Sequence, residues 1–295
     1  MLKVVAEAWA QLSQANPFWV GAGLLLYAAS LLAAAARWRL AVGAVGGHVA
    51  CWPATMAVVA GVFVNNVTPT GRLGGEAARI AVTRLRGSLT VARGALASLC
   101  DRLSDVPAVL LLFVLSLPAL YGYVRSHLNV AAIAAGVIVV AAVLLARWLR
   151  HTLRAWMSTW QRDLRGAALP ARTLALGLGL SALIWIEDLA RVLVVGLAFG
   201  VDFSIAQAAA LCVIAVAANF APTIGGLGAV EGGLMGGLAL FGLPLDTALA
   251  ITTVERAISY GFSTLVGGIV VTLLGGRSLV GAAPAPHGGP GRPQR

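Results

Sequence analysis

The sequence predicts an all-α polytopic membrane protein with two inverted repeats. Each repeat is a span, a re-entrant hairpin and a second span, and one extra span joins them. Three observations support this fold class: 11% of the 295 residues are charged and 59% are hydrophobic, the apolar runs are long, and one motif pattern occurs twice. Soluble domains carry roughly 25% charged residues, so this chain cannot cover a water-soluble surface. Long unbroken runs also argue against an outer-membrane barrel, and such apolar content excludes a largely disordered chain.

The apolar runs define the elements in order, since a helix that crosses a bilayer needs about 20 apolar residues. They lie at 18–36, 49–67, 94–120, 128–146, 173–200, 205–221, 228–243 and 246–274, with basic stretches at 72–93 and 147–172. The first run is long for a signal peptide, and only Lys3 precedes it as a basic residue, so we expect it to be retained. Residues 1–275 therefore form a single transmembrane domain.

Two further segments have their own composition. The linker 147–172 carries tryptophans at near-helical spacing, Trp148, Trp156 and Trp160, beside several arginines. This pattern predicts an amphipathic helix at the membrane surface. The tail 276–295 is rich in Gly and Pro, which predicts disorder.

The positions of the basic residues predict the topology. They fall mainly into four groups: Arg37 and Arg39; Arg72, Arg79, Arg84, Arg86 and Arg93; Arg147, Arg150, Arg154, Arg162, Arg165 and Arg172; and Arg277, Arg292 and Arg295. The joints near 201–204 and 243–246 carry only Asp202 and Asp246. Positively charged loops stay in the cytoplasm, so we expect these joints and the N-terminus outside the cell (inner or plasma) membrane, and the C-terminal tail in the cytoplasm. The net charge of +10 then indicates contact with anionic lipid rather than nucleic acid.

This topology forces two hairpins. Segment 49–71 lies between two cytoplasmic groups and segment 205–243 between two external joints, so each must enter the membrane and return. Two full spans per hairpin are the alternative. The limbs are short for full spans, which favours re-entrant helices broken at a Gly/Pro turn.

The two breaks share a motif. The first is N-V-T-P-T-G-R-L-G-G-E at 66–76, and the second is N-F-A-P-T-I-G-G-L-G-A-V-E at 219–231. Arg37 and Arg191 precede them at similar spacing, and the pairs 101–102 and 255–256, an acid followed by Arg, come after them. An offset of about 153–155 residues relates 17–120 to 172–275, with opposite predicted orientations. Such inverted repeats are a transporter architecture whose site lies at the midplane, where broken helices meet.

The breaks and the buried charges are the candidate site. The return helices begin near Gly74 and Gly228, where free N–H groups and the helix dipole favour an anion such as phosphate. Charged residues inside a membrane face the protein interior and pair, and their spacings place partners on one helix face. A structural ion-pair network that only locks helices remains the alternative, and the carboxylates are also candidate proton carriers. For Gly232, Gly233, Gly236 and Gly237 we favour helix packing.

The predicted substrate-binding residues are Asn66, Pro69, Gly71, Arg72, Gly74, Gly75, Glu76, Arg79, Asp101, Arg102, Asp105, Glu187, Asp188, Arg191, Asn219, Pro222, Gly225, Gly226, Gly228, Glu231, Glu255 and Arg256. No metal-ligand spacing, cofactor motif or nucleophile–base pair stands out, so we expect no enzyme activity, no metal and no cofactor.

The ordered set R-W-R at 37–39, V-N-N-V-T-P-T-G-R-L-G-G-E-A-A-R at 64–79, D-R-L at 101–103, G-G-L-G-A-V-E-G-G at 225–233 and E-R-A-I-S-Y at 255–260 resembles the lysylphosphatidylglycerol synthase transmembrane region family. This family includes the flippase part of multiple peptide resistance factors and stand-alone relatives. The resemblance covers about 17–275. It implies an inner-membrane protein that handles polar lipids: phospholipids, including aminoacylated ones, polyprenyl-linked precursors or hopanoid-related lipids.

Two departures from the family matter. No aminoacyl-transferase domain follows residue 275, so lysyl transfer is not predicted, and Thr-Ile separates Pro222 from the Gly-Gly pair of the second hairpin. We expect a flippase-like translocator of polar or anionic lipids, with the headgroup bound between the two hairpins. The alternatives are a proton-coupled transporter of a small anion and a non-catalytic partner of a lipid-modifying enzyme.

Overall fold

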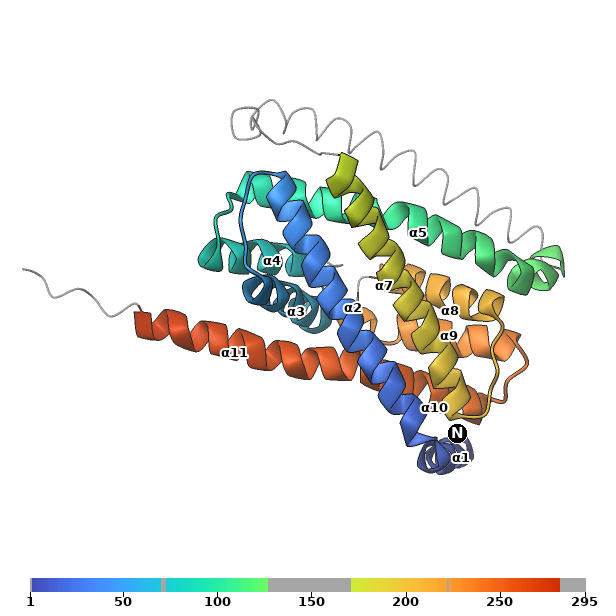
Figure 1. Cartoon of the computed structure of the whole chain (residues 1–295). Coiled ribbons are helices and arrows are strands. Elements are labelled where there is room, and N and C mark those ends of the chain that lie inside the picture. Colours follow the sequence, from blue (N-terminus) through green and yellow to red (C-terminus); the bar gives the residue numbers. More distant parts are fainter. Residues whose placement is uncertain (1, 70–72, 127–170, 222, 282–295) are drawn as a thin grey trace, which may run out of the picture.

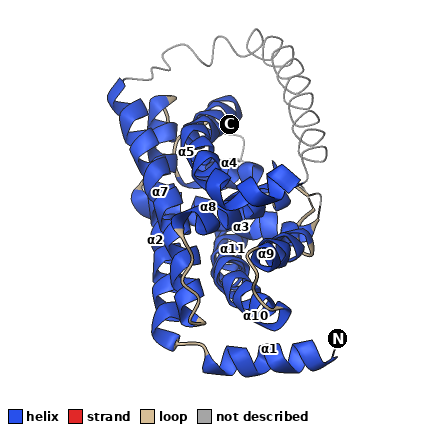
Figure 2. Ribbon diagram, turned by 90° about the vertical axis from the view of Figure 1, so that its right-hand side faces the viewer, coloured by secondary structure: helices blue, strands red, loops and turns tan. Residues whose placement is uncertain are grey.

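The computed structural model describes residues 2–69, 73–126, 171–221 and 223–281, which are helical apart from short connections (Figure 2). The helices are α1 (Leu2–Gln14), α2 (Pro17–Ala44), α3 (Cys51–Val67), α4 (Leu73–Arg86), α5 (Val91–Ser126), α7 (Ala171–Ala198), α8 (Ile205–Ala218), the 3₁₀ turn η1 (Ile224–Gly226), α9 (Ala229–Leu240), α10 (Leu245–Arg256), the π-helix η2 (Ala257–Phe262) and α11 (Ser263–Gly281). The predicted span 128–146, nearly all of the predicted interfacial helix and the candidates Gly71, Arg72 and Pro222 lie outside the described residues.

Local sequence signals set several helix starts. Asn16 accepts a hydrogen bond from the backbone N–H of Phe18, and Pro17 occupies the first position of α2, where it loses no helical bond. Ser204 and Gln207 form a capping box at the start of α8. Helix α1 was not predicted, because its apolar residues alternate with polar ones and form no long run.

Among the described residues, three helices are long and apolar enough to cross a membrane: Pro17–Ala44, Val91–Tyr121 and the continuous stretch Leu245–Gly275. They correspond to the runs predicted at 18–36, 94–120 and 246–274. Helix α7 has the same length as α2, but Glu187, Asp188 and Arg191 lie in its second half. Two predicted ends differ: α2 continues past Arg37 to Ala44, and α11 continues to Gly281, into the segment predicted to be disordered.

Helices α2 and α7 lie side by side and run antiparallel (Figure 1). The backbone N–H of Asn16, before α2, donates to the carbonyl of Ala198 at the end of α7, with a distance of 2.9 Å. Farther along, Arg37 of α2 contacts Ser181 of α7. The two long helices therefore form a central antiparallel pair that positions charged residues from both halves.

The remaining helices exchange partners between the two halves. Helices α3 and α4 form one hairpin, and α8 and α9 form the other. Helix α5 packs on α8 of the second hairpin, and α11 packs on α3 of the first. Each half of the chain thus has the same order of a long helix, a helical hairpin and a long helix, and each last helix supports the other half's hairpin.

The hairpins depend on glycine for close packing. A side chain at Gly61 would come within 2.9 Å of the carbonyl of Gly75, so α3 and α4 approach backbone to backbone. In the second hairpin, a methyl group at Gly233 or Gly237 would meet Ile214 and Leu211 of α8, which confirms a packing role for these two glycines. Gly232 and Gly236 have open space around them instead.

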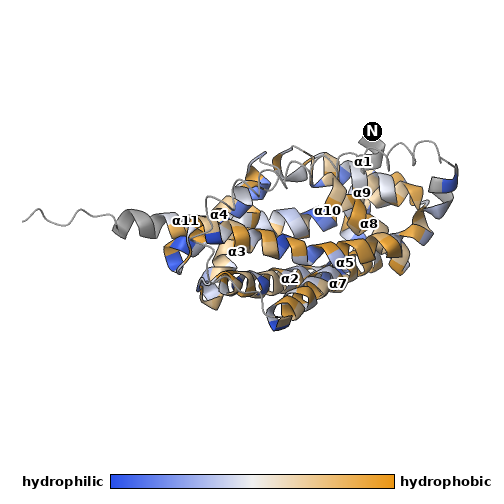
Figure 3. Ribbon diagram, turned by 90° about the horizontal axis from the view of Figure 1, so that it is seen from above, coloured by the Kyte–Doolittle hydropathy of each residue, from blue (hydrophilic) through white to orange (hydrophobic). Residues whose placement is uncertain are grey.

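Hydrophobic residues make up most of the described helices (Figure 3). Large apolar side chains of α5 are about half exposed, including Leu110, Leu111 and Val114. In a membrane protein such residues face lipid, since hydrocarbon is then their solvent. Polar side chains are concentrated inside, where they line a cavity.

Candidate functional site

A cavity of about 320 Å³ lies where the central helix pair meets both hairpins. It brings together twelve of the predicted residues: Asn66, Glu76, Arg79, Asp101, Arg102, Asp105, Asp188, Arg191, Asn219, Gly225, Gly226 and Arg256. Of the other described candidates, Gly75, Glu231 and Glu255 contact these residues without lining the cavity. Pro69, Gly74, Glu187 and Gly228 also lie off its wall.

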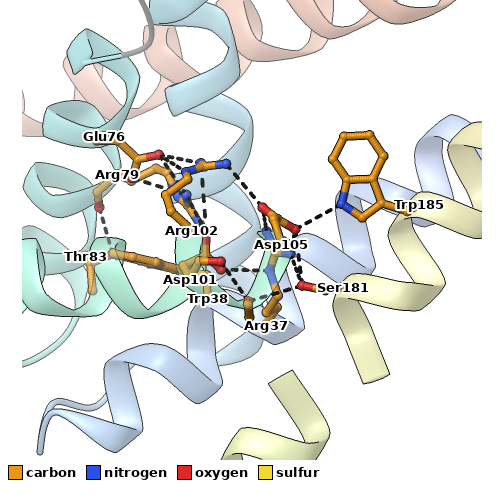
Figure 4. A network of polar contacts seen from close by, with 11 residues as sticks. Arg37, Trp38, Glu76, Arg79, Thr83, Asp101, Arg102, Asp105, Ser181 and Trp185 are labelled. Carbon is orange, nitrogen blue, oxygen red and sulfur yellow. Dashed lines mark hydrogen bonds and ion pairs between the residues drawn. The ribbon is translucent and has the colours of Figure 1, made fainter. Parts of the chain in front are cut away.

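Six residues form the first ion-pair cluster: Arg37, Glu76, Arg79, Asp101, Arg102 and Asp105 (Figure 4). Asp101 of α5 is 1% exposed. Its carboxylate accepts from Nε of Arg37 at 2.8 Å and from both terminal nitrogens of Arg79 at 3.1 Å. Charges buried this deeply require such compensation, because removing them from water is costly.

The cluster connects the first hairpin with the central pair of helices α2 and α7. Arg102 binds Glu76 of α4, with Nε at 2.9 Å from the carboxylate, and its side chain is 46% exposed. Arg37 also binds Asp105, whose carboxylate accepts from the indole N–H of Trp185 at 3.2 Å and from the hydroxyl of Ser181 at 3.2 Å. Residues of α2, α4, α5 and α7 are therefore connected through one polar network.

Trp38 holds Arg79 in this network. Its ring is fully buried beneath the Arg79 guanidinium at 4.3 Å, and its indole N–H donates to Thr83 at 2.9 Å. A cation over an aromatic face gains electrostatic stabilisation that is largest away from water. The tryptophan therefore fixes the side chain of α4 that reaches Asp101.

Five residues form the second ion-pair cluster: Asp188, Arg191, Glu231, Glu255 and Arg256. Arg191 of α7 donates to Glu255 at 2.5 Å and to Asp188 at 3.0 Å, and its guanidinium lies over the ring of Tyr27 at 5.2 Å. Arg256 of α10 donates to Glu231 of α9 at 2.7 Å.

The two clusters follow one plan. In each, the arginine of the first long helix pairs with an acid of the last one: Arg37 with Asp101, and Arg191 with Glu255. In each, the next residue of the last helix pairs with the glutamate of the hairpin: Arg102 with Glu76, and Arg256 with Glu231. The repeated motif thus corresponds to a repeated set of contacts.

The hairpin turns meet beside the cavity. The side-chain amide of Asn66 donates to the hydroxyls of Ser263 and Thr264 at 3.0 and 2.9 Å. Gly225, with φ of +58°, lies against the backbone of Asn66, and its carbonyl accepts from Arg256 at 3.0 Å. Asn219, the equivalent residue of the second hairpin, donates instead to Ala215 in its own helix.

One backbone N–H group at the start of each return helix already donates a hydrogen bond within the protein. The N–H of Gly75 donates to the side chain of Asn65 at 2.8 Å, and the N–H of Gly228 donates to Glu231 at 2.7 Å. These two groups, which we expected to cradle an anion, are therefore satisfied within the protein. The guanidinium groups that line the cavity are the stronger anion ligands.

The clusters differ in charge. The first contains three arginines and three carboxylates, whereas the second contains two arginines and three carboxylates. The second half lacks equivalents of Arg79 and Asp105, and Asp188 is added. The cavity consequently offers donors and acceptors together, an environment suited to a polar headgroup. Glu187 stands apart: one of its oxygens is buried without a hydrogen bond among the described residues.

Sequence reasoning missed several cavity residues. Arg37 was expected at the cytoplasmic end of a span, yet it is 5% exposed and central to the first cluster. Its equivalence to Arg191 in the repeat was the sequence signal that could have predicted its burial. Tyr27, Trp185 and Tyr260 also line the cavity. No motif distinguished Tyr27 and Trp185 from ordinary apolar residues of a span, whereas Tyr260 ends the E-R-A-I-S-Y motif but was not named as a site residue.

Comparisons with known proteins agree with this picture. A family model described as the lysylphosphatidylglycerol synthase TM region matches residues 2–267. A UPF0104 membrane protein of Methanothermobacter thermautotrophicus is 26% identical over 90% of this chain and 88% of its own. A UPF0104 membrane protein of Pyrococcus horikoshii is 24% identical over 84% of both chains. No solved structure matches the chain.

Proposed function

The chain belongs to the lysylphosphatidylglycerol synthase TM region family of multi-pass membrane proteins, and we propose that it translocates polar or anionic lipids across the cell (inner or plasma) membrane. The headgroup would enter the cavity while the acyl chains stay in the bilayer. In the proposed orientation, the N-terminus lies outside the membrane and the C-terminus lies in the cytoplasm, as the charge bias indicates.

One observation carries this proposal: a cavity lined by five arginines lies inside a chain that matches a membrane-protein family and exposes many large apolar side chains. Ionisable residues within membrane segments usually mark a substrate or ion pathway. Arg102, with its side chain 46% exposed, and Arg256, which also lies over the ring of Tyr260, come from the last helix of each half and border the cavity. Each now pairs with a glutamate, so a phosphate would displace Glu76 or Glu231 and accept charge-assisted hydrogen bonds from the guanidinium in its place.

The arrangement of the halves supports an inverted repeat. The first helices of the two halves run antiparallel, and the same ion pairs occur in each half. Helices α4 and α8 have 14 residues each, so each is about 21 Å long. A bilayer core is about 30 Å thick, which favours re-entrant hairpins that meet inside the membrane. Exchange between two such halves exposes a midplane site to each side in turn.

A second candidate function draws on the charge difference between the clusters. Carboxylates outnumber arginines by one in the second cluster, which favours proton coupling, and a small soluble anion fits a cavity of about 320 Å³. Uptake of labelled phosphate by vesicles under a pH gradient, without competition from lipid, would support this candidate. A role as non-catalytic partner of a lipid-modifying enzyme predicts stable co-purification with that enzyme and no transport by the protein alone.

Lipid exchange in vesicles tests the proposal. Purified protein in phosphatidylglycerol-containing vesicles should move a headgroup-labelled phosphatidylglycerol between leaflets. Arg102→Ala and Arg256→Ala should each slow exchange by about tenfold or more, because each removes a charge-assisted phosphate contact of about 1.5–3 kcal/mol. The exposed Arg84 gives the control, Arg84→Ala. Folded Arg102→Ala and Arg256→Ala proteins that exchange lipid like wild type would refute the site.

A further inference from the structure

A second cavity borders the polar one and has the opposite character. It is a groove of about 230 Å³ between α2, α5 and the first half of α7. Apolar groups form most of its lining, among them Leu40, Leu103, Leu174, Gly177 and Leu178. The hydroxyl of Ser104, which also borders the groove, donates to the backbone carbonyl of Asp101. The groove therefore presents almost no free hydrogen-bonding group.

The two cavities share a wall. Arg37 and Asp101 line both of them, and their ion pair of 2.8 Å separates the polar space from the apolar one. An arginine suits this position, because its hydrocarbon stem packs against apolar surface while its guanidinium stays with polar partners. The network of Figure 4 thus forms one side of the partition.

The outer rim of the groove faces the surroundings of the protein. Leu103, Leu174 and Leu178 are 58%, 49% and 43% exposed, and they come from α5 and α7. Exposed leucines on helices of a membrane protein contact hydrocarbon. The groove therefore opens toward lipid at its rim. The Arg37–Asp101 pair lies between the groove and the polar cavity.

We propose that the groove binds an acyl chain of the lipid whose headgroup occupies the polar cavity, so that the substrate is an amphiphile straddling the Arg37–Asp101 pair. This inference rests on the proposed function. The size fits: an apolar cavity of roughly 150 Å³ in another protein holds benzene, and this groove is larger. Each methylene transferred from water into such a site is favourable, but transfer from lipid is nearly neutral, so the groove orients the chain more than it adds affinity.

Two glycines of α7 give a matched pair of variants. Gly177 lines the groove and Gly179 does not, and a Cβ atom added at either position meets no atom within 4 Å. The backbone therefore accepts a side chain at both positions, and we expect the ring of Gly177→Trp to occupy the groove. Gly179→Trp places the same ring on the same helix outside the groove.

Photo-crosslinking tests the inference. Full-length protein is placed in vesicles of phosphatidylcholine and phosphatidylglycerol that contain phosphatidylglycerol with a diazirine at the end of one acyl chain. After irradiation, mass spectrometry should map adducts to Cys100, Leu174 or Leu178 in wild type. Gly177→Trp should abolish most of these adducts and slow lipid exchange, because its ring takes the space of the chain, and Gly179→Trp should leave both unchanged.

Three results would overturn the inference: wild-type adducts that avoid the groove, adducts that persist in Gly177→Trp, or, with a thiol-specific crosslinker in place of the lipid probe, a crosslink from Cys100 to residues 127–170. The last result would show that the chain itself fills the groove. The wild-type map needs no variant to fold. Adducts in the groove without any lipid exchange would refute the proposed function but support the groove. Lipid exchange with unaltered adducts in Gly177→Trp would refute the groove alone.

Discussion

Asp101 is the acid that joins two buried arginines of the first cluster, Arg37 and Arg79. It is 1% exposed and accepts hydrogen bonds from Arg37 and Arg79. Asp101→Asn would leave two buried guanidinium groups short of one negative charge. Removing one partner of a buried ion pair costs about 3–5 kcal/mol. We therefore expect a clearly lower melting temperature in detergent, measured by tryptophan fluorescence.

Asp202→Asn is the matched control for that substitution. Asp202 is exposed in the connection between α7 and α8, and surface substitutions usually change stability by less than about 0.5 kcal/mol. If Asp101→Asn melted at the same temperature as Asp202→Asn, the first cluster would not stabilise the fold.

Single residues also show what the sequence alone can establish. The pairing of Arg102 with Glu76 and of Arg256 with Glu231 follows the repeat spacing and was within reach of sequence reasoning. Burial of Arg37 was not, because a basic residue after an apolar run normally marks a membrane boundary. The helix simply continues to Ala44, and tertiary partners on α5 compensate the charge.

At the scale of elements, the first hairpin depends on Gly61. A methyl group there would lie 2.6 Å from Cγ of Arg79 and 2.9 Å from the carbonyl of Gly75, so α3 and α4 must separate. We expect Gly61→Ala to cost about 1–3 kcal/mol of stability and to lower lipid exchange, since Arg79 is displaced. Gly236→Ala, where the added methyl meets nothing within 4 Å, should be neutral or stabilising. Equal melting temperatures for the two variants would contradict this account of hairpin packing.

The elements differ in how far they follow from sequence. Apolar runs predicted the long helices, and Gly/Pro breaks predicted the hairpins. The π-helix Ala257–Phe262 has no such signal, because its geometry depends on the tertiary contacts of Tyr260 and Ser263 with Asn66. At the equivalent place in the first half, α5 contains Pro107, which also interrupts helical hydrogen bonding. Both last helices are therefore irregular one turn beyond their ion pair.

At the scale of the whole molecule, equivalent residues of the two halves do not make equivalent contacts everywhere. Asn66 reaches across to α11, whereas Asn219 bonds only within its own helix end. The proposed translocation would use this asymmetry. Under that proposal, exchanging these contacts between the halves is expected to expose the cavity to the opposite side of the membrane.

The central claim is that the cluster arginines bind the headgroup rather than only locking helices together. Exchanging the charges of one pair separates these roles. Arg256→Ala leaves Glu231 without its cation and should destabilise the protein by about 1–3 kcal/mol. The double variant Glu231→Arg with Arg256→Glu restores an ion pair between the same positions.

The decisive measurement is the phosphatidylglycerol exchange rate of this double variant, taken together with its melting temperature. Headgroup binding by Arg256 predicts that the melting temperature recovers part of what Arg256→Ala loses, since the N–H of Gly228 still lacks its acceptor Glu231, while the exchange rate stays as low as in Arg256→Ala. Recovery of both melting temperature and exchange rate would contradict the account, because the ion pair would then serve only to hold α9 against α10.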